Sequence, residues 1–172
     1  MFKRFFLVII SALLLGANAA NAASTKRLEA DEKSHYAAVK VFMGEKERKK
    51  WLKLKTRDLR DAWLKERKLW ERYYQYDDEM RQQIAAGEVA VGWPQDAVLM
   101  SWGMPHQRKR LTGRPAIRSE MFVYRFEVDY EGYVTVWQPK SKTAHLAVKL
   151  YQVDLVMDDA VVGELRQKDK WD

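Results

Sequence analysis

The stretch from residue 45 to residue 86 carries apolar side chains at helical spacing. They recur at steps of seven, four, seven, three, seven and four residues, and lysine, arginine and glutamate fill the opposite side. This period predicts amphipathic helices, and Thr56 suits the N-cap of a second one. We therefore expect two helices here, ended by Gly87, with one buried stripe. The stripe consists of Leu52, Leu59, Trp63, Trp70, Tyr73, Met80 and Ile84.

A short unit from Gly92 to Pro105 joins this helical half to the rest of the chain. Pro94 suits the first position of a helix, where its missing N–H costs nothing. Gly103 suits the left-handed residue that follows a helix, and Pro105 prevents the helix from resuming. The unit therefore predicts one short helix at the joint between helices and strands.

The period changes to two after a polar loop that we expect over residues 107–119. Alternating β-branched and aromatic residues predict strands at 121–128, 133–137, 145–157 and 160–166. Asp158 and Asp159 separate the last two strands and predict a hairpin turn rather than a catalytic carboxylate pair. Short turns between strands predict an antiparallel meander.

The fold class expected from these patterns is α+β, with N-terminal helices packed on one face of a small antiparallel sheet of about four strands. Aromatic side chains bury large areas, so tryptophans should fill the space between the two layers. We assign to this core Trp63, Trp70, Trp93 and Trp102.

The N-terminus has the pattern of a secretory signal peptide over residues 1–22. Lys3 and Arg4 precede an apolar run from Phe5 to Leu15, and small residues with Ala-x-Ala spacing follow. The alternative is a retained membrane anchor, but the run is shorter than the roughly 20 residues that span a bilayer. We then expect a polar tail or short helix at 23–43, a helical layer at 44–86, and a short helix with the meander at 87–172, the last two forming one domain.

The composition limits the cellular compartments and the classes of partner that we expect. The chain has no cysteine, which excludes disulfides and a lipid-bearing cysteine. Its net charge is +7, and removal of Lys3 and Arg4 leaves +5. The expected location is the periplasm of a Gram-negative-type bacterium, in association with the outer membrane without a lipid anchor. Export separates the chain from nucleic acid, so we expect an envelope protein or an anionic membrane surface as partner. The sequence does not indicate an oligomeric state.

Part of the chain resembles the GWxTD-domain proteins. The resemblance rests on the segment 41–56, on Arg60-Asp61-Ala62-Trp63, on Gly92-Trp93 and on Gly103-Met104-Pro105. The chain departs from the family pattern after Gly92-Trp93, where Pro94-Gln95 replaces Thr-Asp.

The C-terminal portion, roughly residues 84–166, is similar to the outer-membrane assembly lipoproteins of the BamE/SmpA type. Ile84-x-x-Gly87, Val98, Trp102-Gly103-Met104-Pro105 and Phe122-Val123-Tyr124 follow the order of that family. This resemblance implies a periplasmic, non-catalytic domain that packs against other envelope proteins.

Candidate partner-binding residues are basic or aromatic. The basic ones are concentrated after Pro105, where a basic loop can either bind a partner or be merely solvated. The basic helical face at 45–72 has the same two interpretations, with Glu45–Lys49 as an i,i+4 pair. Interfaces are rich in tryptophan, tyrosine and arginine, which adds four aromatic candidates. The full set is Arg108, Lys109, Arg110, Arg114, Arg118, Trp51, Tyr73, Tyr74 and Tyr76.

Catalytic chemistry has little support in the sequence. The three histidines, His35, His106 and His145, lie in different elements and lack metal-ligand spacing. There is no nucleophile elbow and no phosphate-binding glycine loop. We expect no catalytic, cofactor-binding or metal-binding residue and no cofactor. The favoured interpretation is an interaction module of envelope assembly or maintenance.

Two alternatives stay open at this point. One is a hydrolase or ligand-binding protein with a site between helices and sheet, around Trp102, His106 and His145. The other is a structural subunit of a larger envelope machine, with residues 73–76 and Trp171 at the contact.

Overall fold

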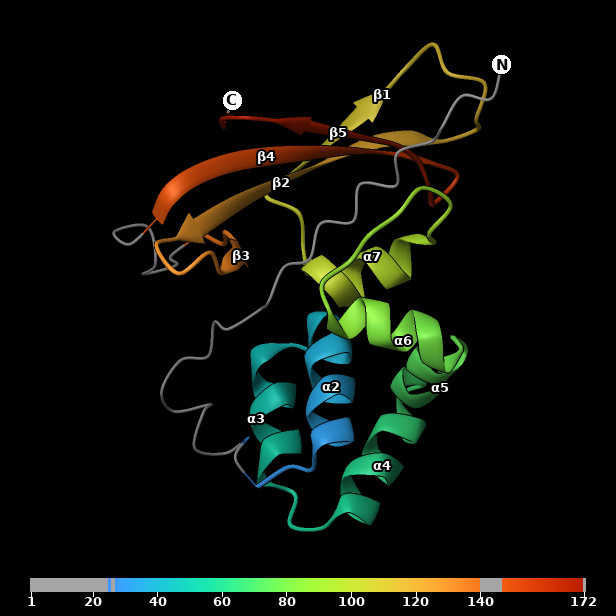
Figure 1. Cartoon of the computed structure of the whole chain (residues 1–172). Helices are drawn as coiled ribbons and strands as arrows, with labels where there is room; N and C mark the ends of the chain where they lie inside the picture. Colours follow the sequence, from blue (N-terminus) through green and yellow to red (C-terminus); the bar gives the residue numbers. More distant parts are fainter. Residues whose placement is uncertain (1–24, 26, 140–146, 172) are drawn as a thin grey trace.

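The computed structural model describes residues 25, 27–139 and 147–171. In that part of the chain the helices come first and the strands follow, so the predicted α+β class is confirmed (Figure 1). The helical elements are α2 (Ala30–Val39), the 3₁₀ turn η1 (Lys40–Phe42), α3 (Glu45–Lys53), α4 (Arg57–Glu66), α5 (Leu69–Tyr74), α6 (Asp78–Ala85) and α7 (Gln95–Trp102). The strands are β1 (Gln107–Leu111), β2 (Ser119–Asp129), β3 (Val134–Val136), β4 (Ala147–Asp158) and β5 (Val161–Lys168).

The helical stretch divides into four helices rather than the predicted two. Thr56 caps α4 as expected, with its hydroxyl accepting from the backbone N–H of Leu59. Two further breaks were not predicted. Lys68 adopts a left-handed conformation (φ 55°) between α4 and α5, and Asp77 caps α6 by accepting from the Met80 N–H at 2.8 Å. Leu59 of α4 falls on the predicted stripe but is 53% exposed, so the stripe is not continuous through the four helices.

The segment before α3, expected as a polar tail or short helix, is a helix that helps to form the core. Tyr36, Ala38 and Val39 of α2 are buried, and so is His35. The described residues of the segment 23–43, which are 25 and 27–43, therefore belong to the helical half. The predicted signal peptide lies outside the described residues.

The sheet is antiparallel and has five strands, in the order β1-β2-β4-β5 with β3 also paired to β2. The predicted meander is wrong in its order, because β2 pairs directly with β4 and β3 lies on the opposite side of β2. The eleven-residue β2 is long enough to hold β1 at one end of that side and β3 at the other. The predicted loop at 107–119 begins with a strand, β1, whose side chains are mostly exposed and therefore show no alternation.

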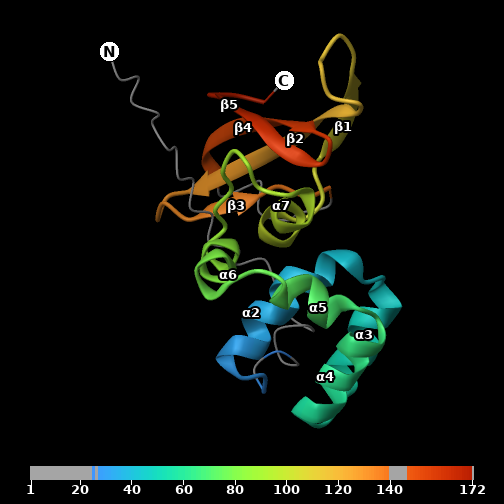
Figure 2. The same ribbon diagram turned by 90° about the vertical axis from the view of Figure 1, so that its right-hand side faces the viewer.

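The described helices lie on one side of the sheet, and α7 lies next to it (Figure 2). Val98, Leu99 and Trp102 of α7 pack in one core with the inward residues of β2, β4 and β5. The other helices have a second core of their own, and Ala97 and Met100 of α7 belong to it.

This division corrects the predicted positions of the tryptophans. Trp102 packs under the sheet, whereas Trp63 and Trp70 belong to the helical core and do not reach the sheet. Trp93 packs against both cores, as does Phe42. The tryptophans at residues 63 and 70 are displaced because α7 occupies the space between them and the sheet.

The unit from Gly92 to Pro105 forms the joint that was predicted. Pro94 is the N-cap of α7, one position before the expected one, and Gly103 has the expected positive φ (77°). The unit also pairs with β5: the Gly92 N–H donates to Val162 O at 2.8 Å, and the Val162 N–H donates to Trp93 O at 2.9 Å. The described part of the chain contains no helix that is long and apolar enough to cross a membrane.

Candidate interaction surface

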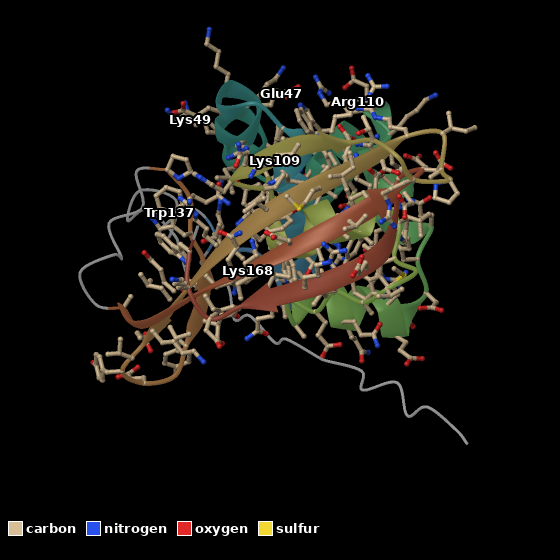
Figure 3. All side chains as sticks on the ribbon, turned by 90° about the horizontal axis from the view of Figure 1, so that it is seen from above. Glu47, Lys49, Lys109, Arg110, Trp137 and Lys168 are labelled. Carbon is tan, nitrogen blue, oxygen red and sulfur yellow. The ribbon has the colours of Figure 1, made fainter. Side chains whose placement is uncertain are left out.

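Strand β1 forms one edge of the sheet and carries three consecutive exposed cations, Arg108, Lys109 and Arg110. We call these three residues the basic edge. Figure 3 labels Lys109 and Arg110 on this strand. The strand pairs with β2 without a register shift, from Gln107 opposite Val123 to Leu111 opposite Ser119. Within the described residues, none of the three cations makes an ion pair within 4 Å of a carboxylate.

The surroundings of the basic edge leave its charge unneutralised. Glu120 lies opposite Arg110 in the register, but its carboxylate pairs with Arg118 at 3.1 Å. The Arg108 guanidinium lies 4.4 Å from the ring centre of Phe122, on the face of the sheet that α7 covers. Lys109 alternates with its neighbours and so points to the other face. The edge therefore presents positive charge on both faces of one strand.

The predicted basic loop continues from β1 and is tied to the β4–β5 turn. Arg114 makes a two-point contact with Asp158, Nε to Oδ1 at 2.9 Å and Nη2 to Oδ2 at 2.6 Å. The Ser119 hydroxyl donates to the same carboxylate at 2.6 Å. These hydrogen bonds from Arg114 and Ser119 lower the pKa of Asp158 to about 2. Arg114 is thus held within the fold by an internal partner.

Asp159 extends this attachment to Arg118. Its carboxylate accepts from the backbone N–H of Arg118 at 2.9 Å, and its own N–H donates to Arg118 O at 2.8 Å. Asp159 and Ala160 have positive φ, so the hairpin turn predicted at Asp158-Asp159 is confirmed. The two carboxylates do more than turn the chain, because they also fasten the loop after β1.

Two of the four aromatic candidates are buried, which corrects their assignment to an interface. Trp51 is 1% exposed, stacks on Tyr36 at 4.7 Å and donates its indole N–H to Arg60 O. Tyr73 is 5% exposed and stacks on His35. Tyr74 is exposed and Tyr76 is half-buried. Tyr73 is buried and Tyr74 is exposed because consecutive side chains on a helix point about 100° apart.

A second basic surface lies on α3. Lys46, Lys50 and Lys53 are exposed there, and Lys49 forms the predicted i,i+4 pair with Glu45 at 2.6 Å. Figure 3 labels Lys49 and Glu47 on this helix. Two glutamates of the same helix lie among these lysines. Positive charge is therefore less concentrated on α3 than on the basic edge.

The histidines do not form a common site in the described part of the chain. His35 is buried in the helical half, and burial lowers its pKa to about 4. His106 lies edge-on to Trp137 at 5.1 Å, with its pKa lowered by burial and by Arg125. Trp102 is 1% exposed and donates its indole N–H to Gly87 O, so it is a core residue rather than the wall of a cleft. The predicted contribution of His145 lies outside the described residues.

Trp171, suggested as a contact of a larger machine, is half-buried against the sheet. Its indole N–H lies 3.0 Å from Tyr151 O, and its ring centre is 5.2 Å from the Arg125 guanidinium. Across residues 25, 27–139 and 147–171, no cluster of three histidine, aspartate or glutamate side chains is arranged to hold a metal ion.

Sequence reasoning missed the strand at 107–111 and therefore its open edge. A run of charged residues on an edge strand has no apolar face, and its period-two signal is lost. The Gly113-containing turn before the next strand is the signal that could have indicated a hairpin. Comparison with protein families, with curated proteins and with solved structures found no match to this chain.

Proposed function

We propose that the protein is an exported, non-enzymatic interaction module of the bacterial cell envelope that binds an acidic protein partner through the basic edge. The observation that carries the proposal is the exposure of Arg108, Lys109 and Arg110 in succession on an edge strand, with no carboxylate of the described residues paired to them. A concentrated field of one sign steers and orients a partner of opposite sign.

One feature of the sequence supports the compartment directly. The first 22 residues have the pattern of a secretory signal peptide. The resemblance to GWxTD-domain and BamE/SmpA-type proteins also points to the periplasm. The resemblance rests on turn and core residues, whereas the basic edge is a property of this chain itself.

The fold is suited to holding such a surface rigidly. The loop that follows β1 is attached to the β4–β5 turn through Asp158 and Asp159, and β2 behind it is buried in the sheet core. A surface on a rigid element loses little conformational entropy on binding. Folding of the chain therefore already orders most of the groups that contact the partner, and binding has few further groups to order.

Affinity purification from crosslinked envelopes tests the proposal. The bait is the full chain, and the variant combines Arg108→Glu, Lys109→Glu and Arg110→Glu. Fractionation of the same cells tests the periplasmic location. We expect the wild-type chain to recover a partner and the triple variant to lose at least nine-tenths of it.

The matched control carries Lys46→Glu, Lys50→Glu and Lys53→Glu on α3, which reverses the same number of exposed charges. This control should recover the partner normally. If recovery is lost with the α3 variant and kept with the β1 variant, the helical face is the binding surface and the proposal is wrong. Recovery of the chain in the cytoplasmic fraction would contradict the location.

A further inference from the structure

We infer that the basic edge binds its partner by β-strand addition, taking an extended acidic segment as a further strand beside β1. This inference rests on the proposed function and specifies how the partner is recognised. An edge strand offers a row of backbone N–H and C=O groups to an incoming chain. In the described part of the chain, the side of β1 that faces away from β2 makes no backbone hydrogen bond.

The opposite edge of the sheet shows how this protein closes an edge that it does not use. Strand β5 contains a bulge where Val156 pairs with Glu164 and Met157 with Val162, leaving Gly163 out of register. Its first residues are covered by the Gly92–Pro94 segment. Its cations are neutralised, with Arg166 paired to Glu164 and Lys168 to Asp154.

Strand β1 has neither the bulge nor the covering segment of β5. Its register with β2 is continuous, and no described segment covers it. Its three cations repel a like-charged strand, but among the described residues they have no carboxylate partner, so they remain able to attract an acidic strand. A regular, uncovered edge can accept another strand, whereas a bulged and covered edge cannot.

The charge of the basic edge selects the kind of strand that it can accept. A second copy of the same edge would bring six cations together, and like charges on neighbouring strands are destabilising. An acidic strand places the Cβ atoms of its acidic residues about 5 Å from those of the opposed cations, within reach of an ion pair. Because Arg108 and Arg110 point to one face and Lys109 to the other, the fitting segment carries consecutive acidic residues rather than alternating ones.

The length of β1 sets the size of the recognised segment. Five residues at about 3.3 Å each give an edge of about 17 Å, so five to seven residues of a partner suffice. The occupant is therefore a short, extended segment of another protein with three acidic residues in succession. A membrane surface offers charge but no backbone to complete the ladder.

Amide hydrogen exchange measured by NMR distinguishes strand addition from simple charge attraction. The probe is the peptide acetyl-Thr-Val-Glu-Glu-Glu-Val-Thr-amide, added to the full chain. In an edge strand, alternate N–H groups point away from the sheet and exchange rapidly. We expect the rapidly exchanging amides of residues 107–111 to slow at least tenfold on binding, with no change in β5.

A charge-swapped pair provides the matched control. The variant with Arg108→Glu, Lys109→Glu and Arg110→Glu should lose affinity for the acidic peptide at least tenfold. It should instead bind the peptide with three lysines in place of the three glutamates, with the same protection of β1. This rescue shows that the variant is folded and that the edge itself is the site.

The outcomes separate this inference from the proposed function. If the peptide binds while the β1 amides exchange as before, or if it does not bind at all, strand addition is wrong. The envelope purification can still succeed in either case, and the proposed function would then stand with another mode of contact. Loss of partner recovery in that purification by the α3 variant alone overturns both.

Discussion

The imidazole of His35 stacks on the phenol ring of Tyr73, with ring centres 4.6 Å apart and planes within 14°. Trp70 and Tyr74 meet the same imidazole edge-on at 5.2 and 5.1 Å. The histidine is 3% exposed, and its Nε2 atom has no hydrogen-bond partner. A titratable group is thus enclosed by aromatic rings in the core of the helical half.

Stability should fall as the pH drops from about 6.5 towards 4, because His35 must be neutral in the folded state. Burial lowers its pKa from 6.5 to about 4. A backbone hydrogen bond at Leu69 and the charge of Asp31 oppose this shift, while Arg57 and Arg81 add to it. In this window the unfolded chain binds more protons than the folded one, so unfolding becomes easier as the pH falls. The expected loss is about 3 kcal/mol, measured by urea unfolding across the window.

The variant His35→Phe is the control for that titration. Its urea midpoint should vary less between pH 6.5 and 4 than that of the wild-type chain, whatever its absolute stability. An equal pH dependence in both proteins would show that other groups cause the effect.

Arg60 and Glu32 form a buried ion pair whose loss should be costly. The Arg60 Nη2 to Glu32 Oε1 distance is 2.7 Å, and both side chains are about nineteen-twentieths buried. Burial opposes ionisation of Glu32, yet hydrogen bonds from Arg60 and from the backbone of Glu29 hold its pKa below the usual value. Arg60→Ala leaves the buried Glu32 carboxylate without its ion-pair partner. We expect this to destabilise the chain by about 3 to 5 kcal/mol in thermal and urea unfolding.

Arg57 on the same helix is the matched control. It pairs with Glu29 and Asp31 but is 41% exposed, so Arg57→Ala should change stability little. Replacing both buried partners, Glu32→Leu with Arg60→Met, should recover much of the loss. A double variant as unstable as Arg60→Ala would argue against a desolvation penalty as the cause.

Gly163 should tolerate no side chain while Asp158 keeps its partners. A Cβ atom at Gly163 would lie 2.7 Å from Asp158 Oδ2, an oxygen already bound to Arg114. Gly163→Ala must therefore displace the carboxylate, and we expect a loss of about 1 to 3 kcal/mol in chemical unfolding. In a background with Asp158→Ala the obstacle is gone, so the same substitution should be nearly neutral. Additive losses in the double variant would rule out this contact.

Trp93 should couple the two cores, because it packs against both of them. Trp93→Ala is expected to cost about 2 kcal/mol and to let the helical half open separately from the sheet. Native-state hydrogen exchange in α4 and β4 measures the two opening free energies. They should coincide in the wild-type chain and in Trp93→Phe, and separate in Trp93→Ala. If the opening free energies of α4 and β4 coincide in all three proteins, α7 and Phe42 rather than Trp93 couple the two cores.

Local patterns predicted the elements better than they predicted their neighbours. The long strand from Ala147 to Asp158 and the hairpin at Asp158-Asp159 follow from alternation and turn residues. The burial of Trp51 and Tyr73 does not, because an aromatic residue on a helix fits a core and an interface equally well. The order of the strands in the sheet could not be predicted either, because the alternation of apolar residues shows which face of a strand is buried but not which strand is its neighbour.

The sequence by itself determined the α+β class, the joint at Gly92–Pro105 and most strands, because hydrophobic period and cap chemistry act within a few residues. Only the tertiary structure decided which charges stay uncompensated. Nothing in the sequence distinguishes the side chain of Arg114 from that of Arg110. In the fold, Arg114 pairs with Asp158, forty-four residues later in the chain, whereas the three cations of β1 pair with no carboxylate among the described residues. Neutralisation depends on distances across the fold, and a strand becomes an edge only when the whole sheet is assembled.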